Sequence, residues 1–498
     1  MLRAPLSHLR SAPPTAWISG LVCLGLILAS LVLHWRAIAD VWLVGPDLFH
    51  LLEASRVGAE RGLGEVLTSK IQPFLNFYRP LTSLSFAVDQ MVWDLNAVGF
   101  QATNLACFGF CLVAFWLTAL RLFGTRRGGA GAIAAVAVFA FMPIAWEVVP
   151  FIERRSECML TGFALLALRA QLSAGKDRAM PIAPAVWSLL AMCSKDSGLA
   201  LLPVYFVAAM VAAPEGGPLD RALRGARAMV PHVVLSSLFF GMRLVAIGGV
   251  GGDENTSLAN LVRVPLVVLD MLGMFMVPKA PVDVGLAFGW SLILTVLLAF
   301  LALVPWTRAF GLGGTSDSDG GELDATALRA WAVLLPWVLI FVGIYTLRGF
   351  ITPWYVFAPS AAWCLLVGLL ADSLAGQLGR GAWIHRLLAA ASLIALASTA
   401  WVQGGRSPIF TGDPHVDGIS EREQTFFAEL ERLILESPSG TVIPAPTIDL
   451  RYRSDVIKWV AVKEFERPVG VFRDAAEAQQ LGTDGLEVVV YYANENER

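Results

Sequence analysis

Residues Thr15–Leu33 read TAWISGLVCLGLILASLVL, nineteen residues without a charge. A second uncharged run, Val284–Thr307, has 24 residues. About 20 apolar residues allow an α-helix to cross the hydrocarbon core of a bilayer. The composition agrees: 56% of the 498 residues are hydrophobic and 15% are charged, against about 45–50% and about 25% in soluble domains. The sequence therefore predicts a polytopic membrane protein and argues against a soluble enzyme, a disordered chain or a disulfide scaffold.

Uncharged runs recur along the chain and predict an α-helical fold with about eleven transmembrane helices. Asp270 interrupts a weaker run, Val264–Pro278, which we interpret as an interfacial helix. The other nine runs are Gly99–Leu120, Gly129–Trp146, Cys158–Leu168, Ala179–Ser194, Ser197–Pro214, Ala228–Met242, Ala330–Leu347, Gly349–Ala371 and Leu387–Gly405. Because Cys158–Leu168 is short, we expect its helix to extend into the charged residues on either side.

The distribution of Lys and Arg predicts the orientation of these helices. With the N-terminus inside, fifteen Lys and Arg residues fall in the inner loops and six in the outer ones. Short cytoplasmic loops carry the excess of positive charge. We therefore expect a multi-pass protein of the cytoplasmic (inner) membrane, with residues 1–402 as its membrane module. Residues 34–98 would form a long first outer loop with interfacial helices.

Residues 403–498 differ from the rest and would lie outside. They hold 17 acidic and 10 basic residues, a net charge of −7. Ser420 and Glu423 have the spacing of a capping box before an amphipathic helix. Val456–Val462 and Leu486–Tyr492 have the Val- and Tyr-rich composition of strands. We predict a small soluble α/β domain.

Several kinds of site find no support in the sequence. A nucleic-acid partner would require a basic patch, which is absent. Cys107 and Cys111 could share a helix face, but two thiols without further ligands make a poor metal site. Asp317-Ser318-Asp319 matches the metal-binding pattern of nucleotide-sugar transferases, but it lies in the Gly-rich stretch Gly311–Gly321, whose composition is typical of a flexible linker. We predict no metal site and no cofactor, and the sequence leaves a metal requirement open.

The chemistry is expected in the outer loops rather than inside the membrane. Within the spans, His232 and Arg243 are the main ionisable residues, whereas ion-coupled transporters usually carry charges near the midplane. The outer loops contain both carboxylates, which can accept a proton from a hydroxyl nucleophile, and cations, which can hold a phosphate leaving group. The candidate substrate-binding residues are His50, Tyr78, Arg79, Glu153, Arg154, Arg155, Lys195, Arg348, Trp354 and Tyr355, and the candidate catalytic residue is Asp47.

Structural interpretations compete with these roles. Asp47 follows Pro46 and is well placed to cap an interfacial helix. Arg79 could bind a lipid headgroup, and Glu153, Arg154 and Arg155 could form a solvated turn with local ion pairs. Lys195 could mark the tip of a helix hairpin. Aromatic residues such as Tyr78 and Trp354 are also common at membrane interfaces.

The order of these segments resembles the integral-membrane glycosyltransferases of the GT-C superfamily, in particular bacterial protein O-mannosyltransferase-like proteins and the membrane part of the TMTC proteins. Tyr78–Ala87 (YRPLTSLSFA) and Trp93–Leu105 (WDLNAVGFQATNL) are similar to that group's "YRPL…LSFALD…WGLNPxGFHLTNL" segment. Ser194-Lys195-Asp196 is similar to its "SKE" turn, and Trp354–Ser360 to "RYLYLPS". The resemblance is patchy and runs from about residue 30 to 372.

The resemblance implies a polyprenyl-phosphate-linked sugar donor and a catalytic acid early in the first outer loop. That loop often has a paired-acid pattern near "DDxxH", and here Pro46-Asp47-Leu48-Phe49-His50 keeps the second acid alone. Because Pro46 stands in the place of the first acid, a mechanism that uses two carboxylates, or a metal held between them, would lack one carboxylate here. Pro353 also replaces the Arg of the "RYLYLPS"-like turn, so another basic residue would bind the donor phosphate.

From these residues we expect a glycosyltransferase that moves a sugar from a polyprenyl-phosphate carrier to a glycan, lipid or protein acceptor at the outer face. Asp47 would be its general base. The alternatives are a lipid-linked-sugar flippase or other transporter, which would need a polar route through the spans, and a membrane anchor that presents the acidic tail to a partner.

Overall fold

The structure is a computed structural model, and it describes residues 14–39, 41, 62–70, 77–94, 96–123, 129–174, 180–212, 217–249, 257–276, 320–348, 352–377, 425, 426, 428–430, 432–438, 441–444, 469–472 and 488–491. Most of these residues are helical. The first half contains α2 (Pro14–Ile38), α4 (Leu63–Val66), α5 (Pro80–Trp93), α6 (Ala97–Phe123), α7 (Ala130–Phe141), α8 (Arg155–Ser173), α9 (Ile182–Ser194), α10 (Leu202–Ala212) and α11 (Pro218–Ile247). The second half contains α12 (Val264–Met276), α14 (Gly320–Arg348) and α15 (Phe357–Gln377).

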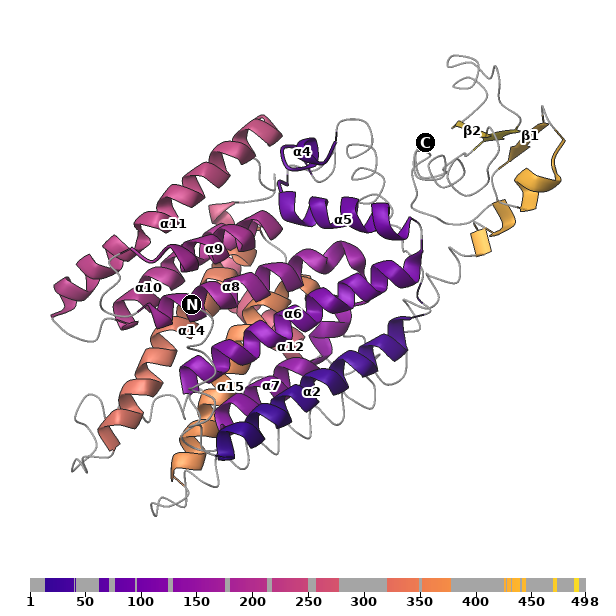
Figure 1. Cartoon of the computed structure of the whole chain (residues 1–498). Helices are drawn as coiled ribbons and strands as arrows, with labels where there is room; N and C mark the ends of the chain where they lie inside the picture. The colour runs from indigo at the N-terminus through magenta and orange to yellow at the C-terminus, as the bar shows by residue number, and fades with distance from the viewer. Residues whose placement is uncertain are drawn as a thin grey trace, which may run out of the picture.

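Short 3-10 helices interrupt or join these elements. They are η1 (Pro143–Glu147), η2 (Ile152–Arg154), η3 (Asp196–Leu201), η4 (Leu258–Arg263) and η5 (Pro353–Val356). Figure 1 shows α2, α6 and α8 side by side in one bundle. Helices suit apolar sequences in lipid because every backbone polar group is paired within the helix.

Nine of the eleven predicted runs fall on described helices, and Val284–Thr307 and Leu387–Gly405 lie outside the described residues. Within the described part, five helical segments are long and apolar enough to cross a membrane: Trp17–Ile38, Ala97–Phe123, Ala130–Glu147, Pro218–Ile247 and Arg329–Arg348. The chain is a multi-pass membrane protein. The count of eleven spans, the orientation and the domain boundaries stay predictions.

Proline residues break two of the predicted runs. The run Gly129–Trp146 is not one helix, because α7 ends at Phe141 and Pro143 opens η1. Proline disfavours the helical conformation of the residue before it, and Met142 is extended, with a ψ of 141°. In the run Gly349–Ala371, Pro353 opens η5 and the α-helix starts only at Phe357. At both breaks a residue in extended conformation and a short 3-10 helix stand where the sequence suggested a continuous α-helix.

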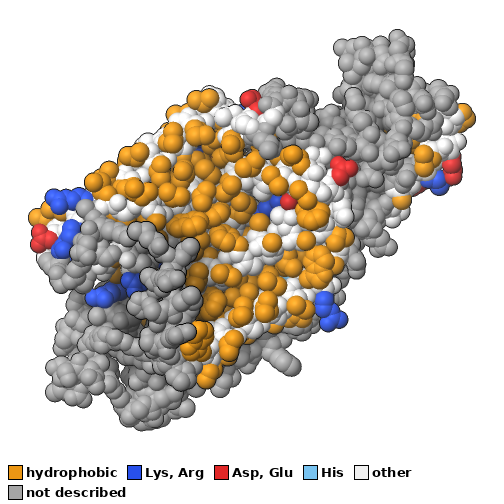
Figure 2. All heavy atoms as spheres, viewed as in Figure 1, with side chains coloured by type: hydrophobic (Ala, Val, Ile, Leu, Met, Phe, Trp, Pro, Cys, Tyr) orange, Lys and Arg blue, Asp and Glu red, His pale blue; other side chains and the backbone are white. Residues whose placement is uncertain are grey.

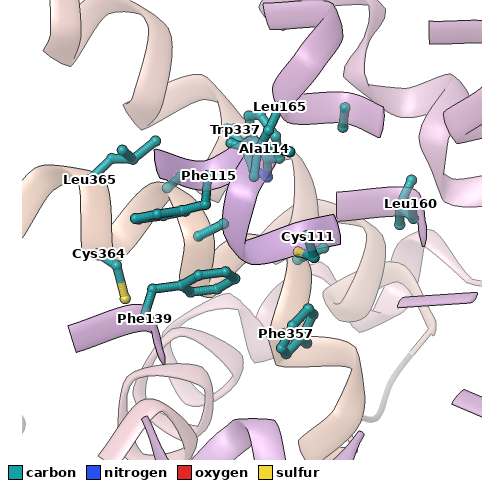
Figure 3. Packing of buried hydrophobic residues seen from close by; sticks show 14 of the residues in the cluster. Cys111, Ala114, Phe115, Phe139, Leu160, Leu165, Trp337, Phe357, Cys364 and Leu365 are labelled. Carbon is teal, nitrogen blue, oxygen red and sulfur yellow. The ribbon is translucent and has the colours of Figure 1, made fainter. Parts of the chain in front are cut away.

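Aromatic side chains fill the core between α6, α7 and α15. The rings of Phe115 and Phe139 stack with centroids 4.3 Å apart, and Phe357 packs against Phe139 at 5.5 Å. Figure 3 shows these rings next to Cys111 and Cys364, both of which are buried free thiols. These two cysteines are therefore core residues, as expected for small apolar side chains.

The helices α7 and α15 approach closely at a pair of glycines. A Cβ atom on Gly368 would lie 2.5 Å from the carbonyl oxygen of Gly131 and 2.7 Å from the Cβ of Ala135. We expect Gly368→Ala to destabilise the protein by about 1–3 kcal/mol, because the backbones must move apart. The melting temperature in detergent measures this loss. Gly343→Ala in α14 is the matched control, since no heavy atom lies within 4 Å of its added Cβ; an equal loss in both variants would contradict the prediction.

The surface of the described helices is mostly apolar between the two ends of the bundle. On α11, Val230, Val233, Val234 and Leu238 remain 47–60% exposed. Figure 2 shows hydrophobic side chains over most of the described part of this face, with Lys and Arg toward both its left and its right ends. Such a face suits contact with lipid tails.

The C-terminal region contains three described strands, β1 (Thr441–Pro444), β2 (Val469–Phe472) and β3 (Val488–Tyr491), in the parallel order β1-β3-β2. β3 coincides with the predicted strand Leu486–Tyr492, whereas the predicted strand Val456–Val462 lies outside the described residues. Residues 428–430 and 432–436 are helical, and Phe426, Leu430 and Ile434 are buried. The extent of an α/β domain stays a prediction.

Candidate functional site

Four segments outside the α-helices come together at one end of the bundle. They are the segment before α5 with Tyr78 and Arg79, the stretch from η1 to η2, the α9–η3 turn, and the start of η5. Two amides of α6 fix the second segment. Gln101 Nε2 donates to the carbonyl of Pro150 at 3.0 Å, and Asn104 Nδ2 donates to that of Val149 at 2.5 Å. The polar side chains of one helix thereby satisfy backbone groups that no helix pairs.

Lys195, at the α9–η3 turn, lies at the centre of the cluster. Its Nζ forms an ion pair with Oε1 of Glu157 in the first turn of α8. The same Nζ lies 4.6 Å from the centroid of the Tyr355 ring, and the guanidinium carbon of Arg348 lies 4.7 Å from that centroid. Two cations from separate elements therefore meet at one aromatic ring, an arrangement stabilised by cation–π attraction.

Tyr345 holds the ring of Tyr355 in place. The two rings stack with centroids 5.6 Å apart and planes 11° from parallel. The hydroxyl of Tyr345 also donates to the carbonyl of Tyr355. The η5 turn is thus fixed to α14, which also carries Arg348.

Arg79 contributes a third cation. Its guanidinium carbon lies 4.8 Å from the ring centroid of Phe77, and its buried Nε has no hydrogen-bond partner among the described residues. Burial lowers the pKa of Lys195 from 10.5 to about 8; Glu157 opposes this shift, whereas the positive charges of Arg79 and Arg348 add to it. Arg79, Lys195 and Arg348 therefore act on one another electrostatically.

Contacts of Tyr78 anchor the segment that carries Arg79 to the turn after α4, to α11 and to Asp196. The hydroxyl of Tyr78 donates to the carbonyl of Leu67 at 2.6 Å, and its ring packs on Phe239 of α11 at 5.5 Å. The backbone N–H of Tyr78 hydrogen-bonds to Asp196, whose Oδ2 lies 3.4 Å from Nε of Arg243 on α11. Arg243, noted in the sequence as a charge within a span, thus supports the site from the membrane side.

Arg154 is fully engaged by its neighbours. Its guanidinium carbon lies 3.9 Å from the ring centroids of both Phe151 and Trp354. It pairs with Glu147 at 3.5 Å and Glu153 at 3.3 Å, and it donates to the carbonyl of Glu147 at 2.6 Å. This side chain joins η1, η2 and η5.

Arg155 is completely buried. Its Nη2 lies 2.6 Å from Oδ2 of Asp89 on α5, and its Nη1 donates to Ser85 at 3.2 Å. Thr103 of α6 donates to Oδ1 of Asp89 at 2.9 Å. Arg155 therefore ties α8 to α5 and α6, and a buried pair of this kind is costly to break.

The described structure brings together seven of the predicted site residues. Two linked groups hold them: Arg79, Lys195, Arg348 and Tyr355 form one, and Glu153, Arg154 and Trp354 form the other. Tyr78 anchors the first group, and Arg155 belongs to the network with Asp89. Asp47 and His50 lie outside the described residues.

The sequence interpretation did not select Glu157, Asp196 or Tyr345. Glu157 and Asp196 stood in charged turns already singled out, so their position beside Arg155 and Lys195 was the available signal. The sequence contained no signal for Tyr345, because a tyrosine near a helix end is common at membrane interfaces.

Buried polar atoms without a partner gather around the cluster. Within the described part of the chain they include Glu157 Oε2, Asp196 Oδ1, Ser197 Oγ and Thr352 Oγ1. Such atoms are rare in folded proteins unless a ligand or water satisfies them. Among the same residues, no group of three or more His, Cys, Asp or Glu side chains could hold a metal ion.

Comparison with known proteins agrees with this geometry at the level of the fold. The crystal structure of ArnT from Cupriavidus metallidurans bound to undecaprenyl phosphate superimposes with a TM-score of 0.50 at 14% identity, over 96% of this chain and 90% of that one. This chain has a GT-C fold. The fold expected from the sequence is confirmed, and the site lies at turns at one end of the helix bundle.

Two further comparisons are weaker. A protein O-mannosyl-transferase of Caenorhabditis elegans is 26% identical over 127 residues, which make up 26% of this chain and 18% of that protein. The oligosaccharyltransferase of Archaeoglobus fulgidus gives a TM-score of 0.49 at 13% identity, over 97% of this chain and 65% of that one. No family model matches the sequence.

Proposed function

We propose that this protein transfers a sugar from a polyprenyl-phosphate carrier to an acceptor at the outer face of the membrane. The observation that carries the proposal is the meeting of Lys195 and Arg348 at the ring of Tyr355, with Arg79 close enough to act electrostatically on Lys195. With Arg243 they bring four positive charges, against two negative charges from Glu157 and Asp196. A partly buried excess of positive charge suits a phosphate group.

The contacts favour two different roles for the five cationic residues that the sequence nominated as candidates. Arg154 pairs with two carboxylates and lies against two aromatic rings, and Arg155 is completely buried against Asp89, so we assign both to positioning the turns. Lys195 also pairs with a carboxylate, Glu157, but it lies among the positive charges of Arg79 and Arg348. Arg79, Lys195 and Arg348 would bind the phosphate. Tyr355 and Trp354 would line the site beside the sugar or the first isoprene unit.

The reaction needs a base on the acceptor side. We assign this role to Asp47, with His50 three positions further along the sequence. The acceptor hydroxyl or amine would attack the sugar carbon opposite the phosphate and form the new bond with inversion. Its proton would pass to the Asp47 carboxylate, and the bond between the sugar carbon and the phosphate oxygen would break, releasing polyprenyl phosphate.

The charges at the other end of the bundle support the proposed orientation. α11 begins near Arg221, Arg224 and Arg227 and reaches the site at Arg243. α8 begins at the site with Glu157 and ends after Arg169. Arginines favour the cytoplasmic side, so the site would face outward from the inner membrane.

A binding measurement with undecaprenyl phosphate tests the proposal; ArnT has been crystallised with this lipid. We expect undecaprenyl phosphate, but not the uncharged undecaprenol, to raise the melting temperature of the purified protein in detergent. An equal effect of the two lipids would overturn the phosphate site.

The affinity for undecaprenyl phosphate should fall as the pH rises through the pKa of Lys195, which is about 8. Below that pH the amine is charged and attracts the phosphate. Above it the amine is mostly neutral, and it must take up a proton from solution before it can pair with the phosphate. Between pH 7 and pH 9 the dissociation constant should rise about tenfold, while the phosphate, with a second pKa of about 6, stays doubly charged. Lys195→Arg keeps its charge and should give a flat profile; a steep profile in that variant would contradict the prediction.

A further inference from the structure

Glu157 pairs with Lys195, the same cation that a phosphate ligand would bind. Its side chain is 1% exposed, and Oε1 pairs with the Nζ of Lys195. Its other oxygen, Oε2, is buried and has no hydrogen-bond partner among the described residues. One carboxylate oxygen of Glu157 therefore pairs with the cation at the centre of the proposed phosphate site, and the other accepts no hydrogen bond from the described residues.

The charges around Lys195 explain why such a carboxylate is needed. Arg79 approaches from the segment before α5 and Arg348 from α14, and both disfavour the charged amine, as burial does. Tyr355 presents an aromatic ring, and Glu157 is the carboxylate that favours the charge. A buried cation without a partner is strongly unfavourable, so an empty site requires an internal anion.

We propose that Glu157 is an internal counter-ion that pairs with Lys195 while the phosphate site is empty and releases it when the carrier phosphate binds. The inference rests on the proposed function and specifies how the site exchanges its anions. Glu157 is a positioning residue in this scheme, because it acts through Lys195 rather than on the sugar.

The exchange has a consequence for product release. A sugar linked to a polyprenyl phosphate is a phosphodiester with one negative charge, whereas the released polyprenyl phosphate is a monoester with nearly two at neutral pH. Glu157 competes for Lys195 and repels both anions, and it repels the product about twice as strongly. It therefore weakens product binding more than donor binding and limits inhibition by the product.

Glu157→Gln tests this exchange in the full-length protein. At pH 6.5, below the pKa of about 8 that Lys195 has beside Glu157, the variant should bind undecaprenyl phosphate at least about fivefold more tightly than the wild type. The methyl diester of undecaprenyl phosphate, which carries one charge, should gain less. Asp94→Asn is the matched control, because Asp94 lies at the exposed end of α5 and accepts from Gln90; its affinities should not change.

The outcomes separate this inference from the proposed function. If the wild type binds undecaprenyl phosphate no better than undecaprenol, both are overturned. If the wild type binds it and a folded Glu157→Gln variant shows equal or weaker affinity, only the exchange is overturned. An equal gain for the monoester and the diester also overturns it, since the effect would then be independent of ligand charge.

A conservative variant covers the case in which Glu157→Gln does not fold. Glu157→Asp keeps the charge and withdraws the carboxylate from Lys195 by one methylene group. The exchange predicts a smaller gain in the same direction at pH 6.5. An unchanged or weaker affinity in the folded Asp variant overturns the exchange.

Discussion

Lys195→Met should weaken the binding of undecaprenyl phosphate by about 100-fold or more, as expected when one partner of a buried charge pair is lost. Lys195 is 7% exposed and faces Glu157, Tyr355 and the charges of Arg79 and Arg348. Methionine has a similar length and no charge, so the variant removes the cation while filling most of its volume. The dissociation constant, measured at pH 7, checks the prediction.

The loss of Lys195 also leaves Glu157 buried without its partner, which by itself can destabilise the fold. The double variant Lys195→Met/Glu157→Gln removes both charges and should fold better. It should bind the lipid more tightly than Lys195→Met, because Glu157 no longer repels the phosphate, but still more weakly than the wild type. Lys70→Met makes the same change in the segment that follows α4 and should leave binding intact. Wild-type affinity in a folded double variant would remove Lys195 from the phosphate site.

The membrane helices could largely be predicted from the sequence, because lipid leaves an apolar chain few alternatives to the helix. The short run Cys158–Leu168 did extend into charged residues, as α8 shows. The breaks at Pro143 and Pro353 were missed because the runs were defined by the absence of charge, and proline carries none. Their backbone effect was nevertheless readable from the residue type.

The gathering of the site could be predicted only in part. Charged turns in alternate loops must lie on one side of a bundle, and this places Lys195, Arg348 and Tyr355 at the same end. Which cation stays available for a ligand depends on partners distant in sequence. Arg155 meets Ser85, 70 residues away, and Asp89 because α5 packs on α8. No local pattern specifies that packing, so Arg155 looked equivalent to Lys195.

Asp47→Asn should reduce sugar transfer by about 100- to 10,000-fold, the usual contribution of a general base. Asparagine has nearly the same shape as aspartate but cannot accept the proton of the acceptor hydroxyl. Because the phosphate would be bound by Arg79, Lys195 and Arg348, the affinity for undecaprenyl phosphate should stay within about twofold of the wild type, a change well below the roughly 1.4 kcal/mol that corresponds to tenfold. Transfer of a labelled sugar and lipid binding, measured on the same purified protein, check both parts.

This pair of measurements distinguishes a transferase from a flippase with the same phosphate site. A transporter of lipid-linked sugars needs cations that bind the phosphate, but it has no proton to remove from an acceptor. If Asp47→Asn moves labelled lipid across vesicles at the wild-type rate and the wild type transfers no sugar, the transporter is favoured. If Asp47→Asn loses lipid binding and transfer together, the residue serves the fold or the phosphate site, as its possible role as a helix cap implies. Loss of transfer with binding retained is the result that only a base on the acceptor side explains.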